Sequence, residues 1–323
     1  MIQFKVKKEE ENQSLEKYIK KALYNYPLSL IYKLFRLKDI KVNNKKEDKH
    51  YLVKENDLIN VYIKDNCLSY SKDNESIIKE DRISNFIIYE DNNILIINKP
   101  RGMLVQKDKE IYKKSLSELV LDYLYFKGEY DPNSLTAYKP GPAHRIDRNT
   151  SGIVVFGKNI SSLHELQSLI KNKEALKKEY LALVKGEVKN SGIISAPILK
   201  INKNNHCVID FTSKDAKEAI SEYYPIKYNK DYSLLDVRLL TGRTHQIRLH
   251  MAYNKTPVVG DDKYGDFSLN KEFKKKYDFE NQFLHAYKLS FIKPQGILSY
   301  LKNKTFEASL NEKMNDILND IFK

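Results

Sequence analysis

Apolar side chains near the start of the chain recur with the spacing of an α-helix. Between residues 13 and 24 they return every three or four positions, which places them on one helical face. Residues 28–36 show the same spacing, and Pro27 suits the first turn of this second helix because that turn needs no backbone N–H from it. The pattern therefore predicts two short amphipathic helices in succession.

A turn and two short strands are predicted next. Asn43 and Asn44 follow the second helix, and asparagine tolerates the left-handed backbone that a tight turn often needs. Apolar runs at 52–53 and 58–63 then predict strands that complete a compact module. The edge of this module is basic, with Lys33, Arg36, Lys38 and Lys41 on or just beyond the second helix.

The rest of the chain is predicted to form a second, larger domain. Residues 69–84 are polar, charged and weakly periodic, which is typical of a linker. We therefore place an N-terminal module at 1–68, a linker at 69–84 and the larger domain at 85–323.

Strands in the larger domain come in runs, with a few helices between them. Apolar runs and alternating patterns predict strands at 86–89, 94–97, 153–156, 180–184 and 232–240. Helical spacing returns over 163–170, after Gly242 and over 310–321. This order favours an α+β fold around a largely antiparallel sheet with flanking helices.

The composition adds a strong positive charge to this picture. Lysine and arginine total 56 against 43 aspartate and glutamate residues, which gives a formal net charge of +13 and a sequence pI near 9.2. Such an excess favours a polyanionic partner, most often nucleic acid. The alternative is a solvated, lysine-rich surface with no such partner, and composition alone does not choose between the two.

The sequence predicts a cytoplasmic protein without a membrane partner. Its first residues form a short alternating segment and a run of charges, unlike the apolar stretch of a secretory signal. Charged residues interrupt every apolar run before it reaches membrane-spanning length. Cys67 and Cys207 lie far apart in unlike settings, which supports neither a disulfide framework nor a cysteine metal site.

Three familiar motifs are present only in imperfect form. Residues 152–158 match the spacing of a phosphate-binding loop, but Asn159 replaces the hydroxyl that would hold magnesium. Residues 144–147 are similar to a kinase catalytic loop, but no Gly-rich loop or Asp-Phe-Gly sequence accompanies them. His245 and His250 are five positions apart, so a helix does not stack them as two zinc ligands. We therefore predict no metal site and no nucleotide cofactor.

Two segments are unusually dense in polar functional side chains. Residues 143–152 place charged and hydroxyl side chains directly before a buried strand, so a rigid loop presents one carboxylate, Asp147, among cations. Neighbouring cations favour the ionised, nucleophilic form of a carboxylate. Residues 241–250 form the second dense segment. On loop composition alone, the alternative is a surface network of ion pairs.

Five ordered motifs together resemble the RluA family of pseudouridine synthases. Residues 144–152, with the sequence HRIDRNTSG, are similar to the family's catalytic signature H-R-L-D-x-x-T-S-G. Residues 241–250 are similar to its T-G-R-T-H-Q-I-R-x-H motif. The segments similar to the family's other motifs are 96–105, 177–186, and 260–266 with 283–286. The resemblance covers about residues 86–310, in the family's order.

The N-terminal module resembles the S4 RNA-binding domain over roughly residues 10–65. The similar segments are 28–36, 40–43 and 53–59. The S4 family usually has a glycine where Lys38 and Asn44 stand in this chain. Together with the Asp-Asp-Lys-Tyr-Gly-Asp run at 261–266, the module implies the S4-bearing, RluC-like subgroup, which modifies large-subunit ribosomal RNA.

The resemblance also implies a reaction and the residues that perform it. The enzyme would be an isomerase that detaches uridine from its sugar nitrogen, rotates it and rejoins it through carbon, with no cofactor. Asp147 would be the catalytic carboxylate, Arg248 would pair with it, and Tyr180 would stack on the base and could take the C5 proton. RNA contacts are expected from Arg145, Arg148, His144, Arg243, His245, Lys33, Arg36 and Lys41.

Several alternatives stay open on the sequence. Asp147 could attack the sugar, attack the base or remove a sugar proton. The same chemistry could act on transfer RNA, or the chain could be an inactive RNA-binding factor for ribosome assembly, which the presence of Asp147 disfavours. A nucleotide-dependent phosphotransferase is disfavoured by Asn159. We expect a monomer whose partner is RNA, in the first place large-subunit ribosomal RNA.

Overall fold

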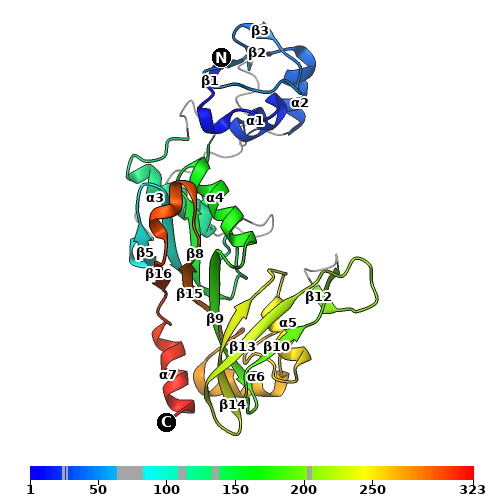
Figure 1. Cartoon of the computed structure of the whole chain (residues 1–323), viewed down its shortest axis with the longest axis vertical. Helices are drawn as coiled ribbons and strands as arrows, with labels where there is room; N and C mark the ends of the chain where they lie inside the picture. The colour runs from blue at the N-terminus through cyan, green and yellow to red at the C-terminus, as the bar shows by residue number, and fades with distance from the viewer. Residues whose placement is uncertain (24–25, 27, 64–82, 108–113, 133–137, 202–205) are drawn as a thin grey trace.

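The computed structural model describes residues 1–23, 26, 28–63, 83–107, 114–132, 138–201 and 206–323. Figure 1 shows a small N-terminal module at one end of the molecule and a larger domain built on a long sheet. Within the described ranges, no helix is both long and apolar enough to cross a membrane.

The N-terminal module combines a four-stranded antiparallel sheet, in the order β1-β4-β2-β3, with two helices that share its apolar core. Its elements are β1 (Ile2–Lys5), the 3₁₀ turn η1 (Lys8–Glu10), α1 (Leu15–Ala22), α2 (Leu28–Leu37), β2 (Ile40–Val42), β3 (Lys45–Lys46) and β4 (Leu58–Val61). The two predicted helices are thus confirmed. Pro27 lies outside the described residues.

The turns of the module follow local chemistry that the sequence partly reveals. The Ser14 hydroxyl accepts a hydrogen bond from the N–H of Lys17, which caps α1. Asn43 and Asn44 both have positive φ angles, 50° and 65°, as the predicted turn between β2 and β3 requires. The strand predicted at 52–53 is reduced to an isolated bridge between Leu52 and Ser14, because the facing chain is a short loop and not a strand.

The predicted linker is described only at its end. Residues 69–82, and Cys67 just before them, lie outside the described residues. At the end of the segment, Ile83 is buried in the core of the larger domain, so the packed part of that domain begins before residue 85.

The larger domain is built on a ten-stranded mixed sheet in the order β10-β13-β14-β9-β15-β8-β6-β5, with β16 beside β15 and β7 beside β8. Among the strand pairs of the described residues, only β8–β15 is parallel, so the predicted α+β fold with a largely antiparallel sheet is confirmed. Its strands are β5 (Ile87–Glu90), β6 (Ile94–Lys99), β7 (Gly141–Pro142), β8 (Ser151–Gly157), β9 (Leu176–Lys185), β10 (Gly192–Ser195), β13 (Ile220–Tyr228), β14 (Tyr232–Leu239), β15 (Leu284–Phe291) and β16 (Thr305–Glu307).

The other elements cover this sheet or extend from it. A separate hairpin consists of β11 (Ile198–Ile201) and β12 (His206–Ile209). The helices are α3 (Leu116–Phe126), α4 (Ile160–Lys171), α5 (Gln246–Tyr253), α6 (Phe267–Tyr277) and α7 (Glu312–Ile321), and η3 (Ser84–Phe86) and η4 (Gly296–Leu301) are short 3₁₀ turns. The sequence pattern predicted neither α3 nor α6, nor the strands β10 to β13.

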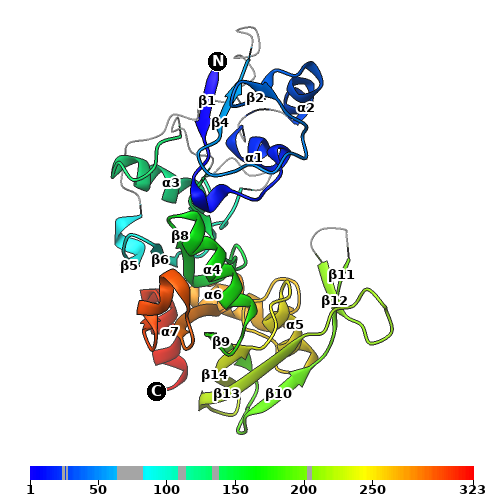
Figure 2. The ribbon, with the colours of Figure 1, turned by 45° about the horizontal axis from the view of Figure 1, so that its top comes forward.

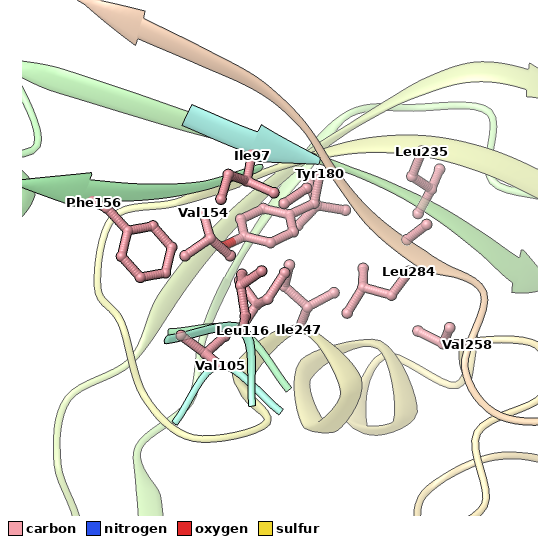
Figure 3. Close-up of a cluster of buried hydrophobic side chains, with 14 of the residues drawn as sticks. Ile97, Val105, Leu116, Val154, Phe156, Tyr180, Leu235, Ile247, Val258 and Leu284 are labelled. Carbon is pink, nitrogen blue, oxygen red and sulfur yellow. The ribbon is translucent and has the colours of Figure 1, made fainter. Parts of the chain in front are cut away.

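Alternate residues of the central strands serve two different cores. On β8, Val154 packs in the core that contains α3 and α5, whereas Ile153 packs in the core that contains α4 and η4. On β9, Leu183 packs against α6 and α7, on the face opposite its neighbours. Because strand side chains alternate between faces, helices on both sides bury the sheet, and the α3–α5 side is the one that carries the site (Figure 3).

The parallel pairing of β8 with β15 depends on one glycine. Gly152 has a φ of +107°, and a Cβ atom placed there would lie 2.2 Å from the carbonyl oxygen of Ala286. Only glycine permits this backbone conformation and this close approach together. Gly152 therefore fixes the start of β8, directly after the polar loop that contains Asp147.

Candidate active site

Asp147 lies in the loop that leads from β7 into β8. Close by, the fully buried ammonium of Lys99 donates hydrogen bonds to the carbonyl oxygens of Pro100, Met103 and Arg148, at 2.9 to 3.0 Å. Lys99 thereby ties the segment after β6 to the loop that presents the carboxylate. Burial lowers the pKa of Lys99 to about 7, while the charge of Asp147 acts to raise it.

Arg248 connects this loop to α5. Its Nη1 lies 3.4 Å from Oδ2 of Asp147, and its Nε and Nη2 donate to the two oxygens of Asp261 at 2.6 and 2.7 Å. Nη2 also donates to Oδ1 of Asp262 at 2.9 Å. Burial alone would lower the pKa of Arg248, but the hydrogen bonds with Asp261 and the charges of all three aspartates raise it above its usual value.

Asp261 is therefore the residue that holds the arginine in place. The side chains of Arg248 and Asp261 are 4% and 1% exposed, and the two-pronged pair fixes both the charge and the orientation of the guanidinium. Asp261 lies within the 260–266 motif, but the motif did not predict a role for it. Its signal was weak, because a carboxylate thirteen residues after an arginine does not show by spacing that the two will meet.

Tyr180 enters the site from β9. Its ring is 6% exposed and packs in the core shared by Ile97, Val154 and Ile247 (Figure 3). Burial and then the charge of Asp147 raise the pKa of the Tyr180 hydroxyl well above its usual value. At neutral pH the side chain is a phenol beside a carboxylate, with a flat ring that could stack on a base.

His245 lies on the other side of the carboxylate. Its φ of 54° is left-handed and directly precedes α5. Its Nε2 is 3.9 Å from Oδ2 of Asp147, and its Nδ1 is 2.9 Å from the hydroxyl oxygen of Tyr264. Burial lowers the pKa of His245, although the charge of Asp147 opposes this. The imidazole is therefore mainly neutral at pH 7 and fills the wall of the site.

These side chains surround a cleft of about 920 Å³. Cations outnumber carboxylates on its walls, where Asp147 and Asp262 are the acidic members. The cationic side chains that line it are Arg145, Arg148, Lys171, Lys173, Lys178, Lys200, Arg243, Arg248 and Lys263. A cleft with this excess of cations favours a polyanionic ligand. Among the described residues, no group of three His, Cys, Asp or Glu side chains could hold a metal ion.

The residues predicted to contact RNA lie in two separate places, at the cleft and in the N-terminal module. Arg145 and Arg148 are exposed at the cleft, and Arg243 is exposed although its Nε donates to the carbonyl of Glu218 at 2.9 Å. His144 also borders the cleft, but its Nε2 accepts a hydrogen bond from the N–H of Val155 at 3.3 Å. This bond directs the imidazole toward β8, as a support for the loop.

The remaining predicted RNA contacts lie in the N-terminal module, away from the cleft lining. Lys33 and Arg36 are exposed on α2, and the ammonium of Lys41 on β2 lies 4.9 Å from the centre of the Tyr62 ring. The structure thus brings Asp147, Tyr180 and Arg248 together but leaves these three cations in a separate group.

Comparison with known proteins identifies the family. The profile of the RNA pseudouridylate synthase family matches residues 93–253, which include Asp147, Tyr180 and Arg248. A protein of Mycoplasma capricolum named "Uncharacterized RNA pseudouridine synthase" is 34% identical over 94% of this chain and 96% of its own length. The chain belongs to the RluA family of RNA pseudouridine synthases.

Other relatives of this pseudouridine synthase carry more specific names. The ribosomal large subunit pseudouridine synthase C of Buchnera aphidicola subsp. Baizongia pistaciae is 32% identical over 88% of this chain and 87% of its own length. A synthase D of Buchnera aphidicola subsp. Schizaphis graminum is also 32% identical, over 94% and 92%. The solved structure of human RNA pseudouridylate synthase domain containing 4 shares the fold, with a TM-score of 0.58 at 20% identity over 74% of this chain and 94% of that one.

Membership of this family makes the protein an isomerase that acts on RNA. The predicted activity class is therefore confirmed, and a phosphotransferase is excluded as its main function. The C and D enzymes of Buchnera, both named for the large ribosomal subunit, match at equal identity, so the comparison does not separate the two subgroups.

Proposed function

We propose that this pseudouridine synthase modifies specific uridines of large-subunit ribosomal RNA, with Asp147 as the catalytic carboxylate. The observation that carries the proposal is the position of Asp147, 3.4 Å from a buried, aspartate-anchored Arg248 in a cationic cleft. A carboxylate held in one orientation by a fixed guanidinium is preorganised for attack or proton transfer.

The target uridine must leave its base stack to reach this carboxylate. Flipping a base costs a few kcal/mol, and exposed cations at the mouth of the cleft can offset this by binding the flanking phosphates. Arg145 and Arg148 occupy that position on either side of Asp147 in sequence. We assign them to the backbone around the flipped nucleotide, where Arg145 could also fill the vacated stack.

The isomerisation itself balances without a cofactor. The bond from the sugar carbon C1′ to N1 breaks, the base rotates, a bond from C1′ to C5 forms, C5 loses a proton and N1 gains one. The raised pKa of Tyr180 makes it a poor acceptor of the C5 proton at neutral pH, because its phenol is already protonated. We therefore assign Tyr180 to stacking on the uracil, with Asp147 as the nearest group able to take a proton.

The decisive experiment is a pseudouridine map of unmodified large-subunit ribosomal RNA after incubation with the purified protein, with Asp147→Asn as control. New pseudouridines that vanish in the control support both the reaction and the carboxylate. Modification of transfer RNA but not of ribosomal RNA would move the proposal to the other substrate. Equal modification by the Asp147→Asn variant would contradict the role of Asp147.

A further inference from the structure

A row of polar side chains, with lysines at both ends, connects the cleft with the N-terminal module along α4. The turn η1 of the module contacts α4, and both views show the module, with α1, at this end of α4 (Figures 1 and 2). Lys17 and Lys21 are exposed on α1, one helical turn apart. They form the end of the row that is farthest from Asp147.

One exposed stripe of α4 continues the row toward the cleft. His164, Ser168 and Lys171 are exposed and follow helical spacing, so they lie on one face over about 10 Å. Burial and then the charges of Lys21 and Lys17 lower the pKa of His164, which shows that these lysines are close enough to act on the α4 stripe. At the other end, Lys171 is itself part of the cleft lining.

The row enters the cleft through a second pair of lysines. Lys173 and Lys178 line the cleft with Lys171, and their mutual repulsion contributes to a lowered pKa of Lys178, after burial. The carboxylate of Glu165 on α4 accepts hydrogen bonds from the backbone N–H groups of Gln295 and Leu298, so it is turned toward η4 and away from the stripe. The stripe therefore presents cationic and neutral groups to solvent.

We propose that Lys17, Lys21, His164, Lys171 and Lys173 form a binding track, here called the α4 track, for the phosphate backbone of the RNA whose uridine enters the cleft. The inference rests on the proposed function, since it takes the same RNA as ligand. Phosphate contacts position an RNA without reading its sequence, so the track fixes how the substrate lies across both parts of the protein. The substrate RNA must then extend beyond the segment that holds the target uridine in order to reach α1.

The test compares two variants that each remove two lysines one helical turn apart. Lys17→Gln/Lys21→Gln removes the end of the α4 track, and Lys271→Gln/Lys275→Gln removes the same charge from exposed positions on α6, outside the cleft lining. Binding is measured against salt concentration with two probes: an unmodified large-subunit ribosomal RNA transcript, and the shortest fragment of it that still competes for binding.

If the α4 track binds RNA, removal of its α1 lysines should reduce the salt dependence of binding for the long transcript but not for the short fragment. On the long transcript, Lys17→Gln/Lys21→Gln should reduce the slope of log K against log salt by about 1 to 2, roughly one per lost phosphate contact. On the short fragment neither variant should change the slope. Equal losses in the α6 control, or an unchanged slope on the long transcript, would overturn the track.

A second variant keeps the test independent of the α1 lysines. Ser168→Glu places a carboxylate in the middle of the exposed stripe, and Ser168→Gln is its neutral match. Ser168→Glu should weaken binding of the long transcript at least several-fold relative to Ser168→Gln and leave the short fragment unaffected. If the slopes respond as expected but no pseudouridine forms on any RNA, the track stands and the proposed function fails; if pseudouridine forms while the slopes stay unchanged, only the track fails.

Discussion

At the scale of single residues, the site depends on groups that hold Asp147 and Arg248 and do not themselves react. The buried carboxylate of Asp261 accepts two hydrogen bonds from the guanidinium, and Lys99 donates hydrogen bonds to three carbonyl oxygens around the loop that carries Asp147. Buried charges of this kind are costly unless each is paired, so removal of one partner affects both stability and geometry.

The two aspartates that bind Arg248 offer a matched comparison. Asp261 is buried, whereas the Asp262 side chain is 55% exposed. We expect Asp261→Asn to reduce the free energy of unfolding by about 3 kcal/mol and turnover by more than tenfold, because Arg248 loses its buried counter-charge. Asp262→Asn should change the unfolding free energy by less than about 1 kcal/mol. Denaturant unfolding and single-turnover assays measure both, and similar losses in the two variants would contradict the assigned role of Asp261.

Lys178 predicts a pH dependence of RNA binding. Burial and then the charge of Lys173 lower its pKa to about 7, so its ammonium is charged below pH 7 and becomes neutral as the pH rises above it. We expect RNA affinity to fall from pH 6.5 to 8.5 and the Lys178→Met variant to lose most of this dependence. The exposed Lys200, also in the cleft lining, serves as control. If Lys200→Met flattens the profile equally, Lys178 is not the titrating group.

At the scale of elements, the strands, the helices and the loops at their ends determine where the side chains of the candidate site lie. Asp147 lies in the loop before β8, Tyr180 is on β9 and Arg248 is in the first turn of α5. The close approach at Gly152 aligns β8 with β15, and His245, with its left-handed backbone, directly precedes α5, which carries Arg248. Two residues with positive φ angles, Gly152 in β8 and Lys38 after α2, lead to stability predictions.

Gly152→Ala should be severely destabilising. The added Cβ would meet the backbone of Ala286 at 2.2 Å and the φ of +107° is strained for any L side chain, so we expect a loss on the order of 4 kcal/mol or failure to fold. Gly102→Ala is the control, because Gly102 has a φ of +80° but no atom within 4 Å of the added Cβ. Its cost should stay near the conformational strain alone, about 1 to 2 kcal/mol. Thermal unfolding of both variants tests whether the close approach matters.

Replacement of Lys38 by glycine should stabilise the N-terminal module. It has a φ of 58° just after α2, where Asp39 N–H donates to the carbonyl of Leu34 and Lys38 N–H to that of Phe35. This is the hydrogen-bond pattern of a helix end that prefers glycine at the left-handed position. We expect Lys38→Gly to raise the free energy of unfolding of the module by about 0.5 to 1 kcal/mol.

The same substitution inside the helix should have the opposite sign. Lys33→Gly lies in the interior of α2 and should lower the free energy of unfolding by about 1 kcal/mol. Hydrogen exchange of α2 amides compares the two variants. A destabilising Lys38→Gly would show that the lysine side chain contributes more than its backbone strain costs.

At the scale of the whole molecule, positive side chains lie on both the larger domain and the N-terminal module. The chain carries a net charge of +13. Cations line the cleft and lie at both ends of the proposed α4 track, and the N-terminal module has Lys33, Arg36 and Lys41 at its own surface. RNA binding by such a surface releases counterions from the phosphates and is therefore sensitive to salt.

We therefore expect RNA binding to depend on salt concentration, and this dependence to be independent of catalytic turnover. If six or more phosphates are neutralised, binding of ribosomal RNA should weaken by about a thousandfold or more between 50 and 200 mM salt. Asp147→Asn should show the same salt slope as the wild-type protein and no turnover, since the carboxylate is assigned to chemistry and not to phosphate binding. A variant that loses affinity in proportion to activity would contradict this separation.

The sequence by itself determined the α+β class, the two N-terminal helices, the turn at Asn43 and Asn44, and the family, because these depend on local periodicity and on motifs that are contiguous in the chain. It did not determine α3, α6 or the strands β10 to β13, whose patterns are short or interrupted by charges. The strand order, the pairing of Arg248 with Asp261, the inward turn of His144 and the contact of the N-terminal module with α4 were decided only by the tertiary structure. Each of these features brings together residues that are far apart in the chain. The spacing of residues along a sequence does not show which distant side chains pack against one another in the fold.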